Sequence, residues 1–389
     1  MAVQRQPAQP LTGSVTSAAF DTVVLGAGPA GLATALALLR GDPLSVLVVD
    51  SGPPERHRVG ETAAPGLLVA LERLGLAERF RAGGHLPCPG TASIWGHDRV
   101  RHNDFVLDPA GPAWRLDRPA FDRMLAAAAE ESGATLRWRT RFDGLEARAD
   151  GRHPHRLRLR SPKEGAYVVA ARWVVDATGP AAHFARAAGA RRQVDDRLFA
   201  LVRFGPAAGD RTTLQTLVEA VPDGWWYGAR TPGDRAVVMF VTDRPGVRRL
   251  RAGGPPAFAA ALAATSLVRS VATTSTEAGV TRLLLPVYSS ALDRHAGEGW
   301  VAVGDAAASY DPIAGQGVYK AVAGAIAAAD QARAGLAGRP PADGSGASPD
   351  AALDGYRRTR AHVYGLERRF PGAAFWEARR ERAALALPG

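Results

Sequence analysis

Three glycines with the spacing G-x-G-x-x-G follow a short apolar run of the sequence. Gly26 permits a tight turn, Gly28 has no Cβ to hold the backbone away from a phosphate, and Gly31 lets a following helix lie close to the preceding strand. Ala30 lies inside the same turn. Because the unpaired N–H groups at the start of a helix attract anions, such a turn can hold a pyrophosphate. The turn therefore predicts a dinucleotide-binding site.

The segments on either side of this turn predict how it is positioned. Residues 23–25 are apolar, as in a buried parallel strand, and residues 32–39 have the composition of a packed helix. A second apolar run, residues 45–49, ends at Asp50, about 20 residues beyond the turn, where a carboxylate accepts hydrogen bonds from adenosine ribose hydroxyls. Strand, turn, helix, strand and acid thus follow the order of a doubly wound (Rossmann-like) α/β domain.

A second glycine-rich segment lies closer to the C-terminus. An apolar run leads into Asp305, and Gly315, Gln316 and Gly317 precede a helix expected to continue to about residue 333. The N-terminus of a helix carries roughly half a positive charge. Such a helix start would stabilise negative charge on a bound cofactor.

Composition limits the remaining possibilities. The 389 residues exceed what one hydrophobic core usually fills, which favours two interleaved domains. The single cysteine, Cys88, excludes an internal disulfide and a cysteine-rich metal site, so we expect no metal and a reducing, cytoplasmic location. The net charge of +10 comes from dispersed arginines without a nucleic-acid-binding motif, and no apolar run suits a membrane span. We therefore expect neither nucleic acid nor a membrane as a partner.

From residue 198 the sequence alternates between apolar and polar residues, with Gly, Pro and Asp turns between the runs. This pattern predicts an antiparallel sheet with strands at residues 198–204, 213–221, 225–229 and 236–241. Three aromatic residues, Trp225, Trp226 and Tyr227, are consecutive on one strand, so the first and third face one way and the second the other. We expect at least one of them to line a substrate cleft, although aromatic residues also fill sheet cores.

Several segments together resemble a known family. They are the first glycine turn, V-G-E at residues 59–61, L-D-R at residues 116–118, D-A-T-G at residues 176–179 and the segment around Asp305. With these motifs the chain resembles the FAD-dependent monooxygenase and tryptophan-halogenase superfamily, which shares the fold of the aromatic hydroxylases. The G-W-W-Y pattern resembles the hydroxylase-like members, and we place the chain nearest those associated with the maturation of quinone cofactors.

This resemblance implies FAD as the cofactor and assigns further residues to it. Asp305 would bind a ribityl hydroxyl, and Arg118 would approach the cofactor, as would Arg58 in the loop before the V-G-E segment. Asp176 and Gly179 end the strand that returns to the nucleotide site. The local sequence also allows a simpler interpretation, in which these loops are capped helix entries and Arg118 is a surface residue.

The resemblance also implies an activity. We expect an FAD-dependent monooxygenase that hydroxylates an aromatic substrate with O₂, through a flavin C4a-hydroperoxide. The substrate would be tryptophan-derived, peptide-bound or carrier-bound, or a small natural product. D-A-T-G replaces the D-G pair of many aromatic hydroxylases, which argues against direct nicotinamide binding, and the lack of a second glycine fingerprint argues against a separate NAD(P)H domain. The electrons would come from NAD(P)H or from a separate flavin reductase. His57 is a candidate catalytic base, although a solvated loop histidine is the simpler interpretation.

Three other activities remain open at this point: a flavin-dependent halogenase, a geranylgeranyl-reductase-like oxidoreductase and a non-catalytic flavin-binding partner protein. Halogenases of the superfamily use a lysine between the V-G-E and L-D-R segments. No lysine occurs between Glu61 and Leu116, because the only lysines of the chain are Lys163 and Lys320. Since arginine is a poor substitute for a reactive amine, the sequence disfavours halogenation.

The expected domain boundaries follow from these segments. They are a disordered lead-in at 1–20, FAD-binding parts at 21–90, 116–190 and 297–335, substrate-domain strands at 91–115, an antiparallel-sheet substrate domain at 191–296, a flexible loop at 336–350 and C-terminal helices at 351–389.

Overall fold

The computed structural model describes residues 18–41, 43–56, 58–147, 153–209, 214–273, 280–339 and 349–386. Most of the expected lead-in, the candidate base His57 and much of the expected loop at 336–350 lie outside these ranges. The first described strand begins at Ala18, inside the segment expected to be a lead-in.

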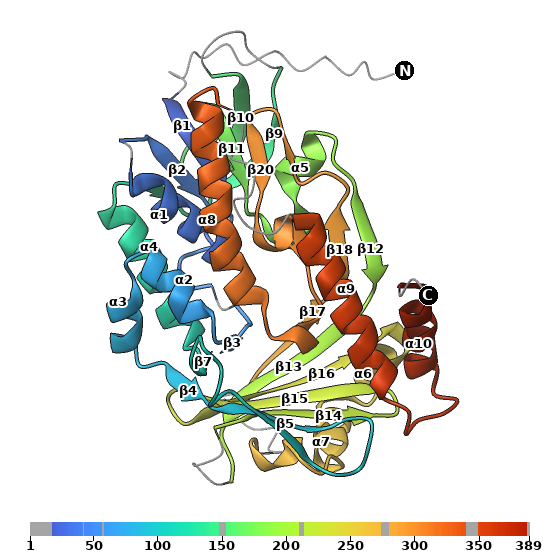
Figure 1. Cartoon of the computed structure of the whole chain (residues 1–389). Helices are drawn as coiled ribbons and strands as arrows, with labels where there is room; N and C mark the ends of the chain where they lie inside the picture. Colours follow the sequence, from blue (N-terminus) through green and yellow to red (C-terminus); the bar gives the residue numbers. More distant parts are fainter. Residues whose placement is uncertain are drawn as a thin grey trace, which may run out of the picture.

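The nucleotide-binding part is built on an eight-stranded sheet (Figure 1). Its strands are β1 (Ala18–Leu25), β2 (Val46–Val49), β8 (Thr135–Arg137), β9 (Arg141–Leu145), β10 (His155–Ser161), β11 (Gly165–Asp176), β19 (Ala296–Gly297) and β20 (Trp300–Ala302). β1 lies between β2 and β11 and is parallel to both, and β20 is parallel to β11. The carboxyl ends of these strands therefore meet at one edge, where ligands of such sheets bind.

Helices cover this sheet because its strands are apolar on both faces. On one face, valines of β1 and β2 pack with α1 (Pro29–Leu39), α4 (Arg118–Glu131) and α8 (Gly317–Leu336). On the other face, Phe184 of α5 (His183–Ala187) packs with β9 and β10 side chains. These layers confirm the Rossmann-like α/β fold.

The second large sheet has seven strands in the order β17-β13-β16-β15-β14-β5-β6. They are β5 (Gly90–Ile94), β6 (Arg101–Asp104), β13 (Phe199–Pro206), β14 (Thr216–Val221), β15 (Gly224–Thr231), β16 (Arg235–Thr242) and β17 (Thr281–Pro286). All pairs are antiparallel except that of β14 with β5. The strands predicted from the alternating pattern are therefore present, and β5 and β6 join them from the preceding segment.

Helices also cover both faces of this second sheet (Figure 1). On one face, α7 (Gly254–Ala263) packs against the sheet, preceded by α6 (Arg244–Ala252). On the other face, α9 (Pro349–Leu366) and α10 (Ala374–Ala386) contribute Tyr364, Phe375 and Trp376 to a shared core. The expected C-terminal helices are thus part of the core of the seven-stranded sheet.

Short elements connect the two large sheets. One three-stranded sheet contains β3 (Thr62–Ala63), β4 (Leu86–Cys88) and β7 (Ala113–Arg115), and another contains β12 (Arg192–Asp196), β18 (Ser289–Leu292) and β21 (Ala308–Ser309). The helices α2 (Leu67–Arg73) and α3 (Ala77–Ala82) follow β3. The V-G-E segment thereby leads into β3, which lies between the nucleotide-binding sheet and the seven-stranded sheet.

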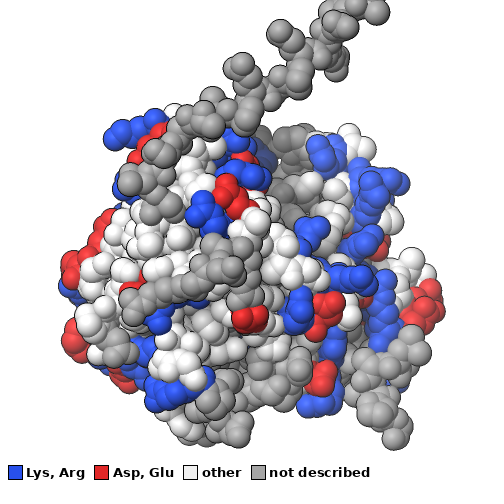
Figure 2. Space-filling model, turned by 90° about the horizontal axis from the view of Figure 1, so that it is seen from above, with Lys and Arg blue, Asp and Glu red and all other residues white. Residues whose placement is uncertain are grey.

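Charged side chains of both signs are interspersed over the face shown in Figure 2. Several surface arginines are paired; Asp143, for example, lies within 4 Å of Arg141, Arg158 and Arg160. No helix in the described part of the chain is long and apolar enough to cross a membrane.

Candidate functional site

The first glycine turn has the backbone shape that a phosphate cradle requires. Gly26 has a φ of +107°, and a Cβ there would overlap the carbonyl oxygen of Ala177. A Cβ at Gly31 would overlap the carbonyl oxygen of Gly26, so only glycine at this position lets the helix lie so close to its strand. At Gly28, by contrast, no described atom lies within 4 Å of the Cβ position. The turn is closed against the protein at two glycines and open at the third.

The helix after this turn leaves its first N–H groups without side-chain partners. Gly28 is the N-cap of α1, it offers no side-chain cap, and the first turn contains no acidic residue. An anion in the open space beside Gly28 would satisfy these donors and would interact favourably with the helix dipole. The observed geometry therefore fits the pyrophosphate of a dinucleotide.

Asp50 ties the glycine turn to the end of β2. One of its carboxylate oxygens accepts hydrogen bonds from the backbone N–H of Ala27 at 2.9 Å and from Arg58 at 3.1 Å, and the other accepts from Gly52 N–H at 2.7 Å. Arg58 also pairs with Asp122 at 3.3 Å. A carboxylate has about four acceptor positions, so Asp50 retains capacity for a ribose hydroxyl. The charge of Arg58 is largely balanced by these two acids.

The structure corrects the expected role of Asp176. This residue is fully buried, one of its oxygens accepts hydrogen bonds from Thr178, and the other accepts from the backbone N–H of Ala185. Because a fully buried side chain cannot touch a cofactor, Asp176 shapes the D-A-T-G turn and orders the start of α5. Gly179 ends this turn at a φ of +68°, with open space around its Cβ position.

The second glycine segment presents another open helix N-terminus. α8 begins at Gly317 with Gln316 as its N-cap, without a side-chain cap or an acidic residue in its first turn. Gly315 has a φ of +58°, and no described atom lies within 4 Å of the Cβ position of Gly315 or Gly317. The positive end of the α8 dipole is thus available to a negatively charged edge of a cofactor.

The two glycine motifs meet in space. A Cβ at Gly304 would lie 2.8 Å from the Cβ of Ala30, so the turn that carries Asp305 packs directly on the first glycine turn. Arg192 supports this turn by donating hydrogen bonds to the carbonyl oxygens of Asp305 and Ala306. Residues that are nearly 300 positions apart in the sequence are therefore placed to contact one dinucleotide.

Asp305 has an unusual electrostatic environment. It reaches solvent, yet the protein around it raises its pKa to about 6 through desolvation, against the attraction of Arg192 and Arg118. This exposed side chain belongs to the turn that packs on the first glycine turn, where it can meet a ligand.

Replacing Asp305 by asparagine should change the pH dependence of stability in the ligand-free protein. An unfolded aspartate titrates near pH 4, so its raised native pKa means that its charge disfavours the folded state as the pH rises from about 4 to 6. Over this range, the melting temperature of the wild type should fall relative to that of Asp305→Asn. The effect should be small because Asp305 contacts solvent. A constant difference between the two melting curves across this range would contradict this prediction.

The V-G-E segment lies between α4 and the start of α8. Arg118 is 4% exposed; it donates a hydrogen bond to the carbonyl oxygen of Val59 and pairs with Asp122 at 3.2 Å. Gly60 has a φ of +113°, and a Cβ there would meet both Arg118 and Val318 of α8. Arg118 is therefore a buried support of this loop rather than a surface residue.

A polar network that the sequence did not reveal joins this loop to the seven-stranded sheet. The hydroxyl of Tyr227 hydrogen-bonds to that of Thr62, and Arg115 donates to Thr62 and, at 2.7 Å, to Thr216. Glu61 is 7% exposed, one of its carboxylate oxygens has no hydrogen-bond partner in the described structure, and burial raises its pKa. The sequence carries no local signal for this network, because its members come from four separate segments.

The structure buries two of the three aromatic candidates for the substrate cleft. Trp226 is 1% exposed and packs against Phe240 and Phe258 on the α7 side of the sheet. Trp225 is fully buried beneath the C-terminal helices, where its ring packs against Trp95. Both tryptophans are core residues because helices cover both faces of the sheet. Of the three aromatic residues, only Tyr227 is partly exposed, on the side of the V-G-E segment.

Comparisons with known proteins agree with this geometry. The protein named "Putative FAD-dependent oxidoreductase LodB" from Marinomonas mediterranea is 27% identical over 377 residues, which cover 94% of this chain and 98% of that protein. The structure of the peptidyl tryptophan dihydroxylase QhpG, described as essential for tryptophylquinone cofactor biogenesis, is 26% identical with a TM-score of 0.72, over 93% of this chain and 79% of that one.

A halogenase shares the same fold. The myxobacterial chondrochloren halogenase CndH superposes with a TM-score of 0.77 at 23% identity, over 95% of this chain and 89% of that one. Residues 19–363 match the family described as the FAD binding domain. The match spans both glycine motifs and the sheet between them, and the chain therefore belongs to this FAD-binding family and is an FAD-dependent oxidoreductase.

Proposed function

We propose that this protein is an FAD-dependent monooxygenase that hydroxylates an aromatic, tryptophan-derived substrate, either peptide-bound or a natural product. The observation that carries the proposal is the junction at Tyr227. There an aromatic ring and a polar network join the V-G-E segment to the seven-stranded sheet, and no lysine occurs between Glu61 and Leu116. A substrate ring would lie beside Tyr227, and the segment lacks the amine that halogenases of the resembling family use.

The residues of the chain would divide the work as follows. Bound FAD supplies electron transfer and oxygen activation. Gly28 and the start of α1 would hold its pyrophosphate, Asp50 its adenosine ribose and Asp305 a ribityl hydroxyl. The start of α8 would stabilise negative charge at the other end of the cofactor. The seven-stranded sheet would cover the reacting region and exclude water.

Product analysis distinguishes hydroxylation from halogenation. The protein would be supplied with FAD, O₂ and chloride or bromide, with electrons from NAD(P)H or from a separate flavin reductase. Tryptophan, tryptophan-containing peptides and indoles would be offered as substrates. We expect the substrate to gain oxygen, whichever of the two electron sources reduces the flavin. A halogenated product would refute the proposal, and the similarity to QhpG makes peptide substrates the first to test.

Tyr227→Ala should uncouple the reaction. Removing the ring opens the wall beside Thr62, so water should reach the activated oxygen and release hydrogen peroxide. Peroxide formed per FADH₂ oxidised should rise several-fold while the affinity for FAD is retained. Trp226→Phe, on the opposite face of the same strand, is the matched control and should leave coupling unchanged. Equal coupling in Tyr227→Ala and the wild type would place the substrate elsewhere.

A further inference from the structure

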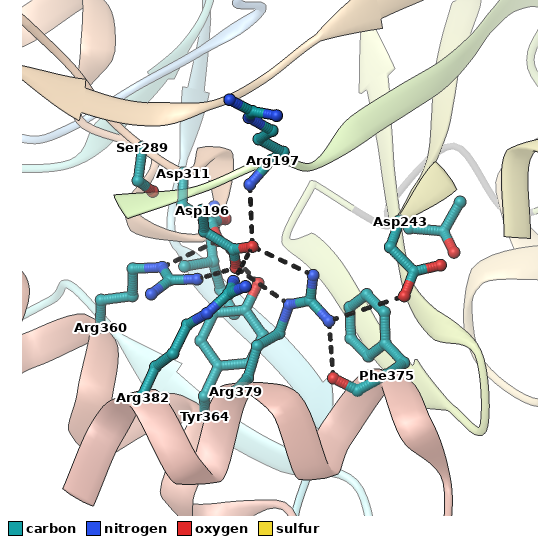
Figure 3. Close-up of polar contacts among 12 residues, drawn as sticks. Asp196, Arg197, Asp243, Ser289, Asp311, Arg360, Tyr364, Phe375, Arg379 and Arg382 are labelled. Carbon is teal, nitrogen blue, oxygen red and sulfur yellow. Dashed lines mark hydrogen bonds and ion pairs between the residues drawn. The ribbon is translucent and has the colours of Figure 1, made fainter. Parts of the chain in front are cut away.

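A buried ionic network joins the C-terminal helices to the rest of the protein. The carboxylate of Asp196, at the end of β12, is surrounded by the guanidinium groups of Arg360, Arg379 and Arg382 (Figure 3). Asp196 is 3% exposed and Arg379 also 3% exposed, and Arg379 further donates to the carbonyl oxygen of Phe375 at 2.6 Å. One acid therefore holds one residue of α9 and two of α10.

Arg360 extends this network to Asp311. Its Nε lies 3.4 Å from a carboxylate oxygen of Asp311, which is 1% exposed. The other oxygen of Asp311 accepts from the backbone N–H of Ile313 at 3.0 Å, and the backbone N–H of Asp311 donates to the Tyr356 hydroxyl at 2.6 Å. Asp311 begins the loop that ends at Gly315, Gln316 and Gly317. The C-terminal helices thus fix the start of the loop that leads to the α8 N-terminus.

Tyr364 links this loop to the seven-stranded sheet. Its hydroxyl donates to Asp311 at 2.7 Å and accepts a hydrogen bond from Trp225 Nε1 at 3.0 Å. Trp225 and Tyr364 are 0% and 1% exposed. Ile313 of the loop packs on the same apolar cluster as these two rings. A continuous chain of buried hydrogen bonds therefore runs from the sheet, through α9, to the loop.

Apolar residues would pack these helices with a smaller loss of hydration free energy than this network does. Buried ion pairs often add little stability compared with apolar residues of the same size, because the charges lose hydration. A buried polar network does, however, favour one arrangement of the elements that it joins. Here that arrangement sets the position of residues 311–317, the loop in front of the open helix N-terminus.

We propose that Tyr364 is a positioning residue for the bound flavin, which it affects by holding Asp311 and thereby the 311–317 loop in register with Trp225 of the sheet. The proposal rests on the flavin-facing role proposed above for Gly315, Gln316 and Gly317. It assigns to the C-terminal helices a part in cofactor binding although they lie outside both glycine motifs. It also gives the buried Trp225 a role, which is to hold the Tyr364 hydroxyl through a hydrogen bond.

The test is an FAD titration of Tyr364→Phe. This substitution keeps the ring and removes the hydroxyl, so Asp311 loses a donor and Trp225 Nε1 loses its acceptor. We expect FAD to bind about tenfold more weakly, the change that follows from disturbing one hydrogen bond to a charged group. We also expect the reduction potential and the visible spectrum of the remaining bound flavin to shift. Trp225→Phe, which breaks only the outer link, should give a smaller change in the same direction.

A double-mutant comparison tests the path itself. If Tyr364 acts through Asp311, then Asp311→Asn combined with Tyr364→Phe should weaken FAD binding less than the sum of the two single effects. Tyr167→Phe is the matched control, since this tyrosine lies on β11 within a different core, and FAD binding should be unchanged.

The readouts separate this proposal from a merely structural role and from the proposed reaction. An unchanged FAD affinity and flavin spectrum in Tyr364→Phe, with only a lower melting temperature, would overturn it. Additive effects of the Tyr364 and Asp311 variants would do the same. The FAD titration does not measure hydroxylation. A failure to find a hydroxylated product would therefore count against the proposed function and would not change the result of the titration.

Discussion

Gly28→Val should abolish stoichiometric FAD binding while the protein remains folded. The Cβ position of Gly28 is open to space that no described residue fills, so the valine meets no protein atom there. Its side chain would instead occupy the space in front of the α1 N-terminus, where we place the pyrophosphate. We expect the affinity for FAD to fall by about a hundredfold, at the upper end of the overpacking range. Fluorescence titration with FAD and the melting temperature of the ligand-free protein measure the two parts of this prediction.

Two further glycine variants serve as controls for this result. Gly324→Val, at another open position within α8, should leave the affinity for FAD nearly unchanged. Gly31→Val should instead damage the fold, because its Cβ would overlap the carbonyl oxygen of Gly26. Normal FAD binding by a folded Gly28→Val protein would refute the assignment of the first glycine turn.

Asp196→Ala should strongly destabilise the protein. Removing this carboxylate leaves Arg379 buried and Arg360 nearly buried without their shared acid, and breaking one partner of a buried ion pair costs about 3 to 5 kcal/mol. The midpoint of urea denaturation should therefore fall, and α9 and α10 should lose protection from proteolysis first, since Asp196 is the acid that binds both helices.

A surface carboxylate with the same number of partners is the matched control. Asp143 also lies within 4 Å of three arginines, but the side chains of those arginines are 44 to 60% exposed. Because water and salt screen such pairs, Asp143→Ala should change the denaturation midpoint far less than Asp196→Ala. Equal effects of the two substitutions would show that burial does not control the strength of these networks.

Backbone features of the site could be predicted from sequence because they are local. The positive φ values of Gly26 and Gly315, and the close approach at Gly31, follow from residue type and spacing within a few positions. The β1 and β15 strands follow in the same way from their patterns of apolar residues. The alternation along β15 correctly separated Trp225 and Tyr227 from Trp226.

Side-chain roles were predicted less well, because they depend on contacts between distant segments. Asp176 has the residue type and position of a cofactor ligand, yet its side chain is fully buried and bonds to Thr178 and Ala185 inside the protein. Trp225 was one of three candidates for the cleft, but the packing of α9 and α10 buries it. A strand pattern states which residues share a face, and it does not state what covers that face.

By itself, the sequence determined the two glycine motifs, the α/β class, the inserted sheet and the family, because each of these depends on short-range geometry or on motif spacing. Only the tertiary structure decided that Tyr227 meets Thr62, that Arg118 supports the V-G-E loop and that Asp196 binds both C-terminal helices. These contacts join residues from 59 to 186 positions apart. The energy of a buried charge or hydroxyl depends on what the fold places around it, and that environment is created only when distant elements pack together.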